Sequence, residues 1–216
     1  MRHVVWDWNG TLFDDQHLVV DGLNAVLDHA SVPRVDLATY QRLYTRPVRR
    51  FYERVFGRDI GDTEWSELDA VFHAGYRDAL HRAGLAHDAH RALDAVAQAD
   101  ATQSLLSMWR HVELVPLVSQ LGIHDRFVHV QGLTGPGGGR KAPHLAAHLD
   151  DVADAAGADP GRVLVVGDAL DDAEAAREVG AACVLYDGGS HPREHLEATG
   201  FPVASTLTEA LDRALG

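Results

Sequence analysis

The sequence predicts an α/β protein, with a doubly wound parallel sheet interrupted by an inserted helical segment. Short apolar runs rich in β-branched residues alternate with amphipathic segments over residues 1–15 and 86–216, which is typical of parallel strands joined by helical crossovers. Residues 16–85 have helical spacing instead. Two of the apolar runs end at an aspartate, Asp7 and Asp168, so acidic groups follow two predicted strands.

The first predicted strand is the short run that begins at His3 and ends at Trp6. Asp7 stops the run, and Asn9-Gly10-Thr11 follow as a turn. A run that stays apolar at successive positions is typical of a strand buried on both faces. We therefore place Asp7 directly after the carboxyl end of a buried strand.

The inserted segment begins at Gln16, where apolar residues adopt a spacing of three and four. Leu23, Val26, Leu27 and Ala30 form one such stripe. No strand pattern interrupts the segment, and further helices are predicted over 36–45, 47–56 and 63–83. We therefore predict two domains, an α/β core of residues 1–15 and 86–216 and a helical domain of residues 16–85.

After the insert, helices and strands alternate. We predict helices over 88–98 and 111–121, a third helix that begins near Ala142, and a fourth that follows Asp168 and ends at Gly180. The predicted strands are 102–107, 127–131, 163–166 and 182–186. A flexible Gly-rich connection is predicted over 135–139. Because parallel strands need crossover connections, this order favours a parallel sheet with helices on both faces.

The composition limits the classes of partner that the chain is expected to bind. The formal net charge of -13 argues against a nucleic-acid or anionic-membrane partner, because a phosphate backbone is held mainly by clustered basic residues. The single cysteine, Cys183, excludes an internal disulfide, and no apolar run reaches the roughly 20 residues of a membrane helix. The histidines, such as His29, His124 and His191, lack metal-ligand spacing, and we expect most at the surface. We expect a soluble, cytoplasmic protein with a small-molecule partner.

The two aspartates at strand ends are the strongest functional signal. In doubly wound sheets, ligands bind beyond the carboxyl ends of strands where the strand order reverses, so Asp7 and Asp168 can converge. Paired carboxylates completed by water and substrate phosphate suit Mg²⁺. Each aspartate alone could also be a helix N-cap, but the pair and its flanking residues favour a metal site.

The residues around these aspartates resemble a known family. The string DWNGTL at residues 7–12 looks like the first motif of the haloacid dehalogenase-like hydrolase superfamily, and GDALDD at residues 167–172 looks like its fourth. Ser107 at a strand end and Lys141 before a helix match its second and third motifs. The helical insert falls where this superfamily places its first-type cap. The chain thus resembles the phosphoglycolate phosphatase-like branch, with a Rossmann-like core and a cap domain.

This resemblance implies a Mg²⁺-dependent phosphatase that acts on phosphoric monoesters. Asp7 would attack phosphorus and form an aspartyl-phosphate that water then hydrolyses. Asp168 would bind Mg²⁺ directly, together with Asp7 and the backbone carbonyl of Asn9. Asp172 would hold a metal-bound water or the motif lysine, and Asp171 could do the same.

The resemblance also implies residues that hold the phosphate group. Ser107 would donate a hydrogen bond to the phosphate group, and Lys141 would offset its negative charge. Without the family resemblance, Ser107 would be interpreted as a strand-end cap and Lys141 as a solvated surface charge. The loop amides of residues 9–11, which include Gly10 and Thr11, would complete the cradle. The Gly-rich loop before Lys141 lacks the spacing of a P-loop.

Arginines in the insert are the candidate contacts to the rest of the substrate. Arg46, Arg49 and Arg50 would reach the substrate when the cap closes. A run of charges is also typical of a solvated helix face, and that interpretation stays open.

Asn9 departs from the family pattern. Phosphatases of this superfamily usually have an aspartate there, which protonates the leaving group and activates water. An amide cannot do so, which removes a factor of about 10² to 10⁴ in rate unless another group supplies it. A leaving group that needs little protonation, or a surrogate among Asp14, Asp15 and His17, would make up the loss.

Two classes of function follow. The first is a phosphatase acting on a small phosphorylated metabolite. The second is a catalytically weak regulatory protein that binds such a metabolite, because Asn9 removes the acid/base but leaves the phosphate and metal ligands. Dehalogenation is disfavoured because it needs no Mg²⁺ and would leave the acidic cluster of residues 167–172 without its metal.

Overall fold

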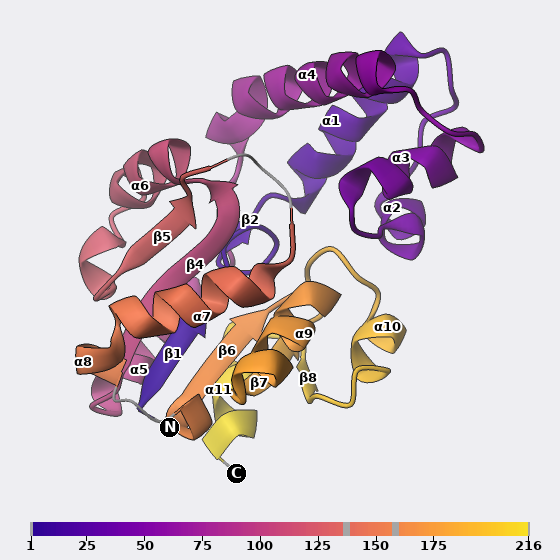
Figure 1. The fold of residues 1–216 in the computed structure, drawn as a ribbon. Helices are drawn as coiled ribbons and strands as arrows, with labels where there is room; N and C mark the ends of the chain where they lie inside the picture. The colour runs from indigo at the N-terminus through magenta and orange to yellow at the C-terminus, as the bar shows by residue number, and fades with distance from the viewer. Residues whose placement is uncertain (1, 136–138, 157–159, 216) are drawn as a thin grey trace. The chain divides into compact units, whose positions relative to one another are not determined.

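The computed structural model describes residues 2–135, 139–156 and 160–215, and it confirms the predicted α/β class (Figure 1). A six-stranded sheet runs in the order β5-β4-β1-β6-β7-β8, and all its strand pairs are parallel. Its strands are β1 (His3–Trp6), β4 (Thr102–Arg110), β5 (Val130–Leu133), β6 (Val163–Gly167), β7 (Ala182–Tyr186) and β8 (Val203–Ala204).

The strand order reverses around β1. The chain leaves β1 towards β4 and β5 on one side, and then returns to β6, β7 and β8 on the other. Trp6 pairs with Val166 in register, so the residues that follow β1 and β6 leave the sheet at the same edge. This reversal is the place where open α/β sheets bind ligands.

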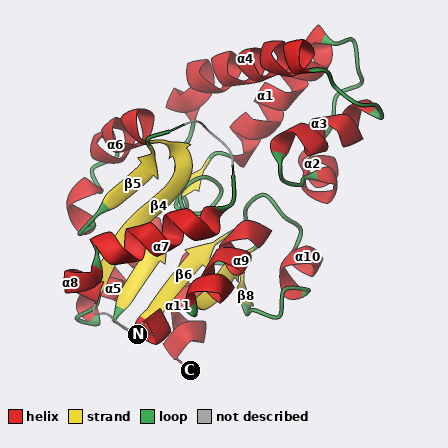
Figure 2. Cartoon of the chain, in the orientation of Figure 1, coloured by secondary structure: helices red, strands yellow, loops and turns green. Residues whose placement is uncertain are grey.

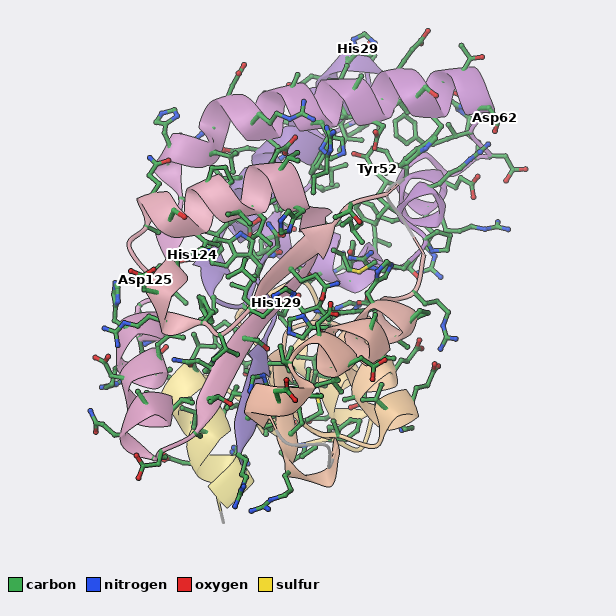
Figure 3. The ribbon with its side chains drawn as sticks, turned by 60° about the vertical axis from the view of Figure 1, so that its left-hand side comes forward. His29, Tyr52, Asp62, His124, Asp125 and His129 are labelled. Carbon is green, nitrogen blue, oxygen red and sulfur yellow. The ribbon has the colours of Figure 1, made fainter. Side chains whose placement is uncertain are left out.

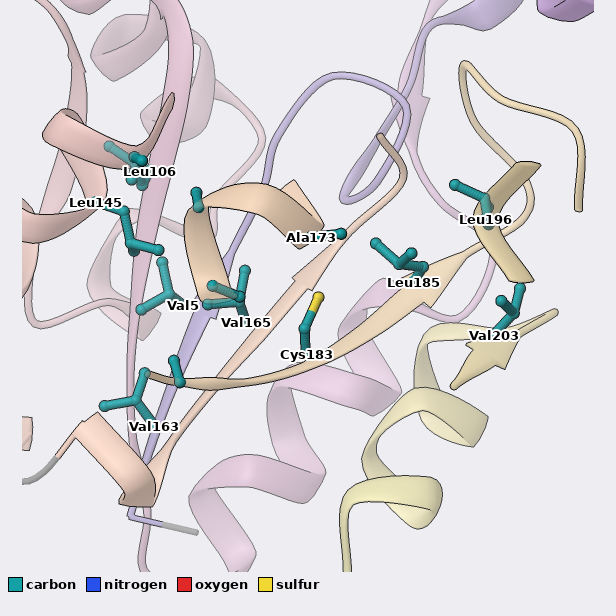
Figure 4. Packing of buried hydrophobic residues seen from close by; sticks show 14 residues of the cluster. Val5, Leu106, Leu145, Val163, Val165, Ala173, Cys183, Leu185, Leu196 and Val203 are labelled. Atoms are coloured by element: carbon teal, nitrogen blue, oxygen red, sulfur yellow. The ribbon is translucent and has the colours of Figure 1, made fainter. Parts of the chain in front are cut away.

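Helices cover both faces of the sheet (Figure 2). On one face, α7 (Lys141–Asp151) packs beside α9 (Leu170–Val179), and on the other α5 (Ala89–Gln98) packs beside α11 (Leu207–Leu215). Figure 4 shows Val5 and Val165 of the sheet packed with Leu145 of α7 and Ala173 of α9, all of them buried. The remaining helical elements of this part are α6 (His111–Gln120), η2 (His124–Arg126), α8 (Ala153–Ala156), η3 (Pro160–Arg162) and α10 (Arg193–Glu197).

Contacts divide the chain into two compact units, Met1–Phe13 with Leu85–Gly216, and Asp14–Gly84. We call these the core unit and the helical unit; the boundaries lie within two residues of those we expect from the sequence. The helical unit consists of α1 (Gln16–His29), α2 (Leu37–Leu43), α3 (Val48–Phe56), α4 (Asp62–Ala79) and η1 (Leu80–Arg82). Among the described residues, no helix has both the length and the apolar character that crossing a bilayer requires.

The helical unit has its own apolar core. Leu23, Val26 and Leu27, which form the predicted stripe of α1, are buried, and α4 packs against this helix. Aromatic rings from α2 and α3 pack into the same core, including Tyr52, which lies among the helices in Figure 3, and Ile60 and Leu68 complete it. Gly22 permits the close approach, because a Cβ there would lie 3.1 Å from the Phe72 ring.

Several predicted boundaries are wrong. The strand expected at 127–131 is β5, which begins at Val130 because the 3₁₀ turn η2 precedes it. Ser107 does not close its strand, since β4 continues to Arg110. The insert ends in β3 (Gly84–Leu85), which forms a separate two-stranded sheet with β2 (Phe13–Asp14). Residues 136–138 of the predicted Gly-rich connection lie outside the described residues.

The histidines agree in part with the prediction. His29 is exposed at the edge of the view in Figure 3, His124 is half-buried, and most others are exposed or half-buried. His3, His148 and His191, however, are buried. A lone histidine in a polar stretch of sequence gives no periodic signal of burial, because its burial depends on packing between distant segments.

Candidate active site

Three carboxylates meet at the carboxyl ends of β1 and β6. Asp7 follows β1, Asp168 follows β6, and Asp172 lies in the first turn of α9. One oxygen from each of the three lies within 4.8 Å of the others. The three residues are only 9%, 1% and 2% exposed. The predicted convergence of Asp7 and Asp168 is therefore present in the structure.

The Thr11 hydroxyl bridges the first two carboxylates. Its Oγ1 lies 3.0 Å from Asp168 Oδ1 and 3.3 Å from Asp7 Oδ2, and the residue is fully buried. The turn that places it depends on Gly10, whose φ of 75° lies in the left-handed region that glycine adopts readily. Thr11 thus ties the turn after β1 to the residue that follows β6.

The amides of this turn are engaged within it. Gly10 N–H donates to the Phe13 carbonyl at 2.9 Å, and Thr11 N–H donates to the Trp8 carbonyl at 3.1 Å. Neither amide is therefore directed at an incoming phosphate group in this structure. The sequence predicted a role for the backbone amide of Thr11, but it did not predict the contacts of its hydroxyl with Asp7 and Asp168.

Lys141, the only lysine of the chain, is the cation of the cluster. It is the first residue of α7, is 4% exposed, and its Nζ contacts Asp7 Oδ1 and lies 2.5 Å from Asp172 Oδ1. Burial alone would lower its pKa, but Asp172 and Asp7 outweigh burial and the pKa of Lys141 is raised. The ammonium group therefore stays charged and holds both carboxylates.

The neighbouring backbone fixes the other two aspartates. Asp172 Oδ2 accepts the Ala169 N–H at 3.0 Å, so both of its oxygens have a partner. Asp168 Oδ2 accepts the Ser190 N–H at 2.6 Å. A Cβ at Gly189 would lie 2.1 Å from the same Asp168 oxygen, so only glycine allows this approach. Sequence reasoning missed Gly189 and Ser190, because they follow β7 and no motif links them to Asp168.

The negative charges of the site exceed the positive one. Burial raises the pKa of Asp7 to about 6, with Lys141 opposing the rise and Asp172 adding to it. Burial, followed by Asp7 and Asp172, raises the pKa of Asp168 well above its usual range. Carboxylate oxygens crowded around one ammonium group have the donor chemistry that a hard divalent cation requires. The residues present therefore fit a metal ion of that kind.

Two further predicted site residues are Ser107, which lies in β4, and Asn9, which lies in the turn after β1. Ser107 is 1% exposed, and its Oγ accepts the Trp109 N–H at 3.0 Å within β4. Its hydroxyl proton has room for a further acceptor, since the bond to Trp109 uses only a lone pair. Asn9 is half-buried and forms an isolated bridge with Phe13.

The arginines expected to bind substrate belong to the helical unit. Arg49 is tied within that unit, where it lies 2.6 Å from Asp62, 3.6 Å from Glu53, and donates to the Ile60 carbonyl. Arg46 is exposed and lines a hollow of the same unit.

Sequence comparison relates the chain to known hydrolases. Residues 1–180 match the model of the haloacid dehalogenase-like hydrolase family. A curated phosphoglycolate phosphatase from Mesorhizobium japonicum is 26% identical over 226 residues, which cover 99% of this chain and 97% of that protein.

Structure comparison gives the same fold. A haloacid dehalogenase-like family protein from Streptococcus pneumoniae has a TM-score of 0.81 at 19% identity, covering 99% of this chain and 98% of the other. A protein described as a predicted phosphoglycolate phosphatase from Haemophilus somnus has a TM-score of 0.79 at 16% identity, covering 99% and 98%. With its family match over residues 1–180 and the motif aspartates gathered at the sheet edge, this chain belongs to the haloacid dehalogenase-like hydrolases.

Proposed function

We propose that the chain is a phosphatase that hydrolyses a small phosphorylated metabolite through an aspartyl-phosphate at Asp7. The observation that carries the proposal is the position of Asp7, which contacts Lys141 and lies within 4.8 Å of Asp168 and Asp172 through carboxylate oxygens. The relative from Mesorhizobium japonicum supports a substrate with a carboxylate beside its phosphate ester, as in phosphoglycolate.

The carboxylate of Asp7 has the properties of a nucleophile. With a pKa of about 6, it is mostly ionised at pH 7 and above. One of its oxygens would attack phosphorus, the bond from phosphorus to the ester oxygen would break, and the leaving alcohol would take up a proton. Water would then attack the aspartyl-phosphate, release inorganic phosphate and regenerate Asp7. Lys141 would keep Asp7 oriented and offset the charge that accumulates there.

Asp7, Asp168 and the backbone carbonyl of Asn9 would hold Mg²⁺. Asp172 would contribute indirectly, by holding the ammonium group of Lys141. When bound, the metal ion would neutralise negative charge on the phosphoryl oxygens. Thr11 and the Ser190 amide would keep Asp168 in place, because their hydrogen bonds occupy both of its oxygens.

The proton for the leaving group is the weak point of this scheme, because Asn9 cannot supply it. Of the possible surrogates, Asp14 and His17 are exposed, whereas Asp15 is fully buried and accepts a hydrogen bond of 2.5 Å from the Tyr76 hydroxyl. Asp15 is therefore the least available of the three. We propose that turnover of ordinary esters is slow and that esters with good leaving groups are preferred.

Exchange of Asn9 for aspartate tests the scheme. In Asn9→Asp, kcat for an alkyl phosphate such as phosphoglycolate should rise by about 10², because a titrating group is restored beside the leaving oxygen. The increase should be smaller for p-nitrophenyl phosphate, whose leaving group needs little protonation. Phosphate release with and without Mg²⁺ measures both effects, and Asp7→Asn in the Asn9→Asp background serves as the inactive control.

The alternative is a regulatory protein that binds the metabolite without hydrolysing it, and Asn9 is the residue that favours it. In that case neither the wild type nor Asn9→Asp would release phosphate from any ester, although both would bind Mg²⁺ and phosphate in calorimetric titrations. Rapid acid quench and mass spectrometry of the peptide containing Asp7 would find no added phosphate.

A further inference from the structure

The helical unit contains a hollow lined by arginines, which include Arg46 and Arg50, two of the candidate substrate contacts predicted from the sequence. Its volume is about 760 Å³, and it lies over the connection before α3, along α3 and in the turn that follows. The ionisable side chains that line it are Arg46, Arg50, Arg54 and Arg58 with Glu53 and Asp59. The lining therefore has four positive and two negative groups, a net charge of +2, in a chain whose formal net charge is -13.

The spacing of these arginines places them on adjacent turns. Arg50 and Arg54 are four residues apart in α3 and so lie on one face of the helix. Two like charges at this spacing are mutually unfavourable. Glu53 offsets them only in part, because it lies 3.4 Å from Arg50 and is shared with Arg49 at 3.6 Å. An anion that contacted both arginines would remove the remaining repulsion.

Arg54 is the cation that its neighbours satisfy least. Its guanidinium donates a long hydrogen bond of 3.4 Å to the Leu43 carbonyl, a neutral acceptor, and forms no ion pair within the described part of the chain. Arg58, by contrast, is held by Glu64 at 2.5 Å. The planar fork of an exposed arginine binds phosphate and carboxylate groups with two parallel hydrogen bonds.

We propose that this hollow is a binding site for a small, multiply charged oxyanion, held mainly by Arg50 and Arg54 with Arg46 beside them. The residues that form it belong to the helical unit alone. Phosphate or carboxylate groups fit the guanidinium donors. A long polyanion such as nucleic acid does not fit, because the negative charge of the whole chain repels it outside this hollow.

Calorimetric titration of the metal-free full chain tests the proposal, with pyrophosphate and tricarballylate as probes. Arg54→Gln should weaken the binding of pyrophosphate about 5- to 10-fold, because it removes a charged hydrogen-bond donor at an exposed site. Arg50→Gln combined with Arg54→Gln should weaken it further. Arg54→Lys, which keeps the charge but loses the planar fork, should give an intermediate affinity. If the variants lose affinity for tricarballylate to the same extent, the site binds phosphate and carboxylate groups alike. If they lose affinity for pyrophosphate alone, the site prefers phosphate groups.

Arg34→Gln is the matched control, because Arg34 belongs to the same unit, pairs with Asp28 outside the hollow, and loses the same charge. If Arg34→Gln and Arg54→Gln weaken both probes equally, or if neither probe loses affinity in the double variant, the proposal is overturned. The titration involves no turnover, so its outcome does not depend on the proposed hydrolysis. A chain that binds pyrophosphate through Arg54 but hydrolyses no ester would retain this site and lose only the proposed function.

Discussion

The ion pairs around Lys141 in the core unit and the Arg34–Asp28 pair in the helical unit differ in exposure to solvent. In the core unit, Lys141 is 4% exposed as it contacts Asp7 and Asp172. In the helical unit, the paired side chains of Arg34 and Asp28 are 69% and 48% exposed. Removing one partner of a buried pair leaves a charge without compensation, whereas water compensates an exposed one. Charge changes should therefore be costly at the buried cluster of the core unit and nearly neutral at the exposed pair of the helical unit.

The largest effect is expected for Lys141→Met. Without the ammonium group, three carboxylates share a buried site, so the free energy of unfolding should fall by about 3–5 kcal/mol in metal-free buffer. The pKa of Asp7 should rise further, because Lys141 is the main influence that opposes its increase on burial. Mg²⁺ should stabilise the variant more than the wild type, since the metal ion would supply the missing positive charge. Urea unfolding with and without Mg²⁺ measures both quantities.

Arg140→Met is the matched control for this prediction. Arg140 precedes Lys141 and also pairs with an acid, Glu178, but its side chain is 61% exposed. The control should lose little stability and show no added dependence on Mg²⁺. Similar losses in the two variants would contradict the contrast between buried and exposed pairs.

A second effect, of intermediate size, comes from uncharged polar groups buried in the core unit. His3 Nδ1 lies 2.7 Å from Thr102 Oγ1, and Ser104 Oγ lies 2.7 Å from both His3 Nε2 and His148 Nε2. His148 Nδ1 lies 2.6 Å from Gln131 Oε1. One consistent arrangement has Thr102 donating to His3, His3 to Ser104, Ser104 to His148, and His148 to Gln131, with both histidines neutral.

This chain of hydrogen bonds predicts acid lability. Burial lowers the pKa of His3 to about 4 and that of His148 to about 3, against 6.5 in the unfolded chain. Between pH 6.5 and the lowered pKa values, the unfolded state binds more protons than the folded state. The contribution of the two neutral histidines to the free energy of unfolding is therefore fully present above pH 6.5 and falls as the pH decreases towards 4. Each histidine contributes at most about 1.4 kcal/mol per pH unit in this window.

Denaturation at several pH values between 5 and 7.5 tests this, with His148→Gln compared to the wild type. The raised pKa of Asp7 acts in the opposite direction between about pH 4 and 6, so the difference between the two proteins is the informative quantity. His148→Gln should flatten the loss of stability on acidification. His124→Gln, which replaces a histidine whose side chain is 44% exposed, should leave the slope as it is in the wild type. Equal slopes in all three proteins would refute the assignment.

The sequence predicted the parts of the fold that have a local cause. The strands β1, β6 and β7 are runs of mostly apolar residues, and their limits agree with the prediction to within one residue. β8 (Val203–Ala204) and the C-terminal helices α10 and α11 were not predicted. A strand of two residues has no periodicity, and its pairing with β7 is decided by tertiary packing.

The same distinction applies to the candidate site. Asp7 and Asp168 were found because a strand end and a motif mark each of them, and Asp172 was found because it belongs to the same motif as Asp168. Gly189 and Ser190 contact Asp168 only through the fold, so nothing near them in sequence indicates it. The hydrogen bonds that link His3 and His148 likewise join segments far apart in the chain.

The smallest effect is expected for the exposed pair of the helical unit. Arg34 Nε and Nη2 donate to Asp28 at 3.0 and 2.6 Å, an arrangement with good bidentate geometry. Arg34 also holds the pKa of Asp28 below its usual range, so the pair exists at neutral pH. Because both side chains are exposed, water and salt replace the interaction at little cost, and Arg34→Gln should change Tm by less than about 2 °C. The change should shrink further in 1 M NaCl, where the Debye length is about 3 Å. Differential scanning calorimetry at low and high salt measures it. A Tm loss comparable to that of Lys141→Met would mean that exposure does not decide the cost of losing an ion pair, and the comparison between the buried and the exposed pair would fail.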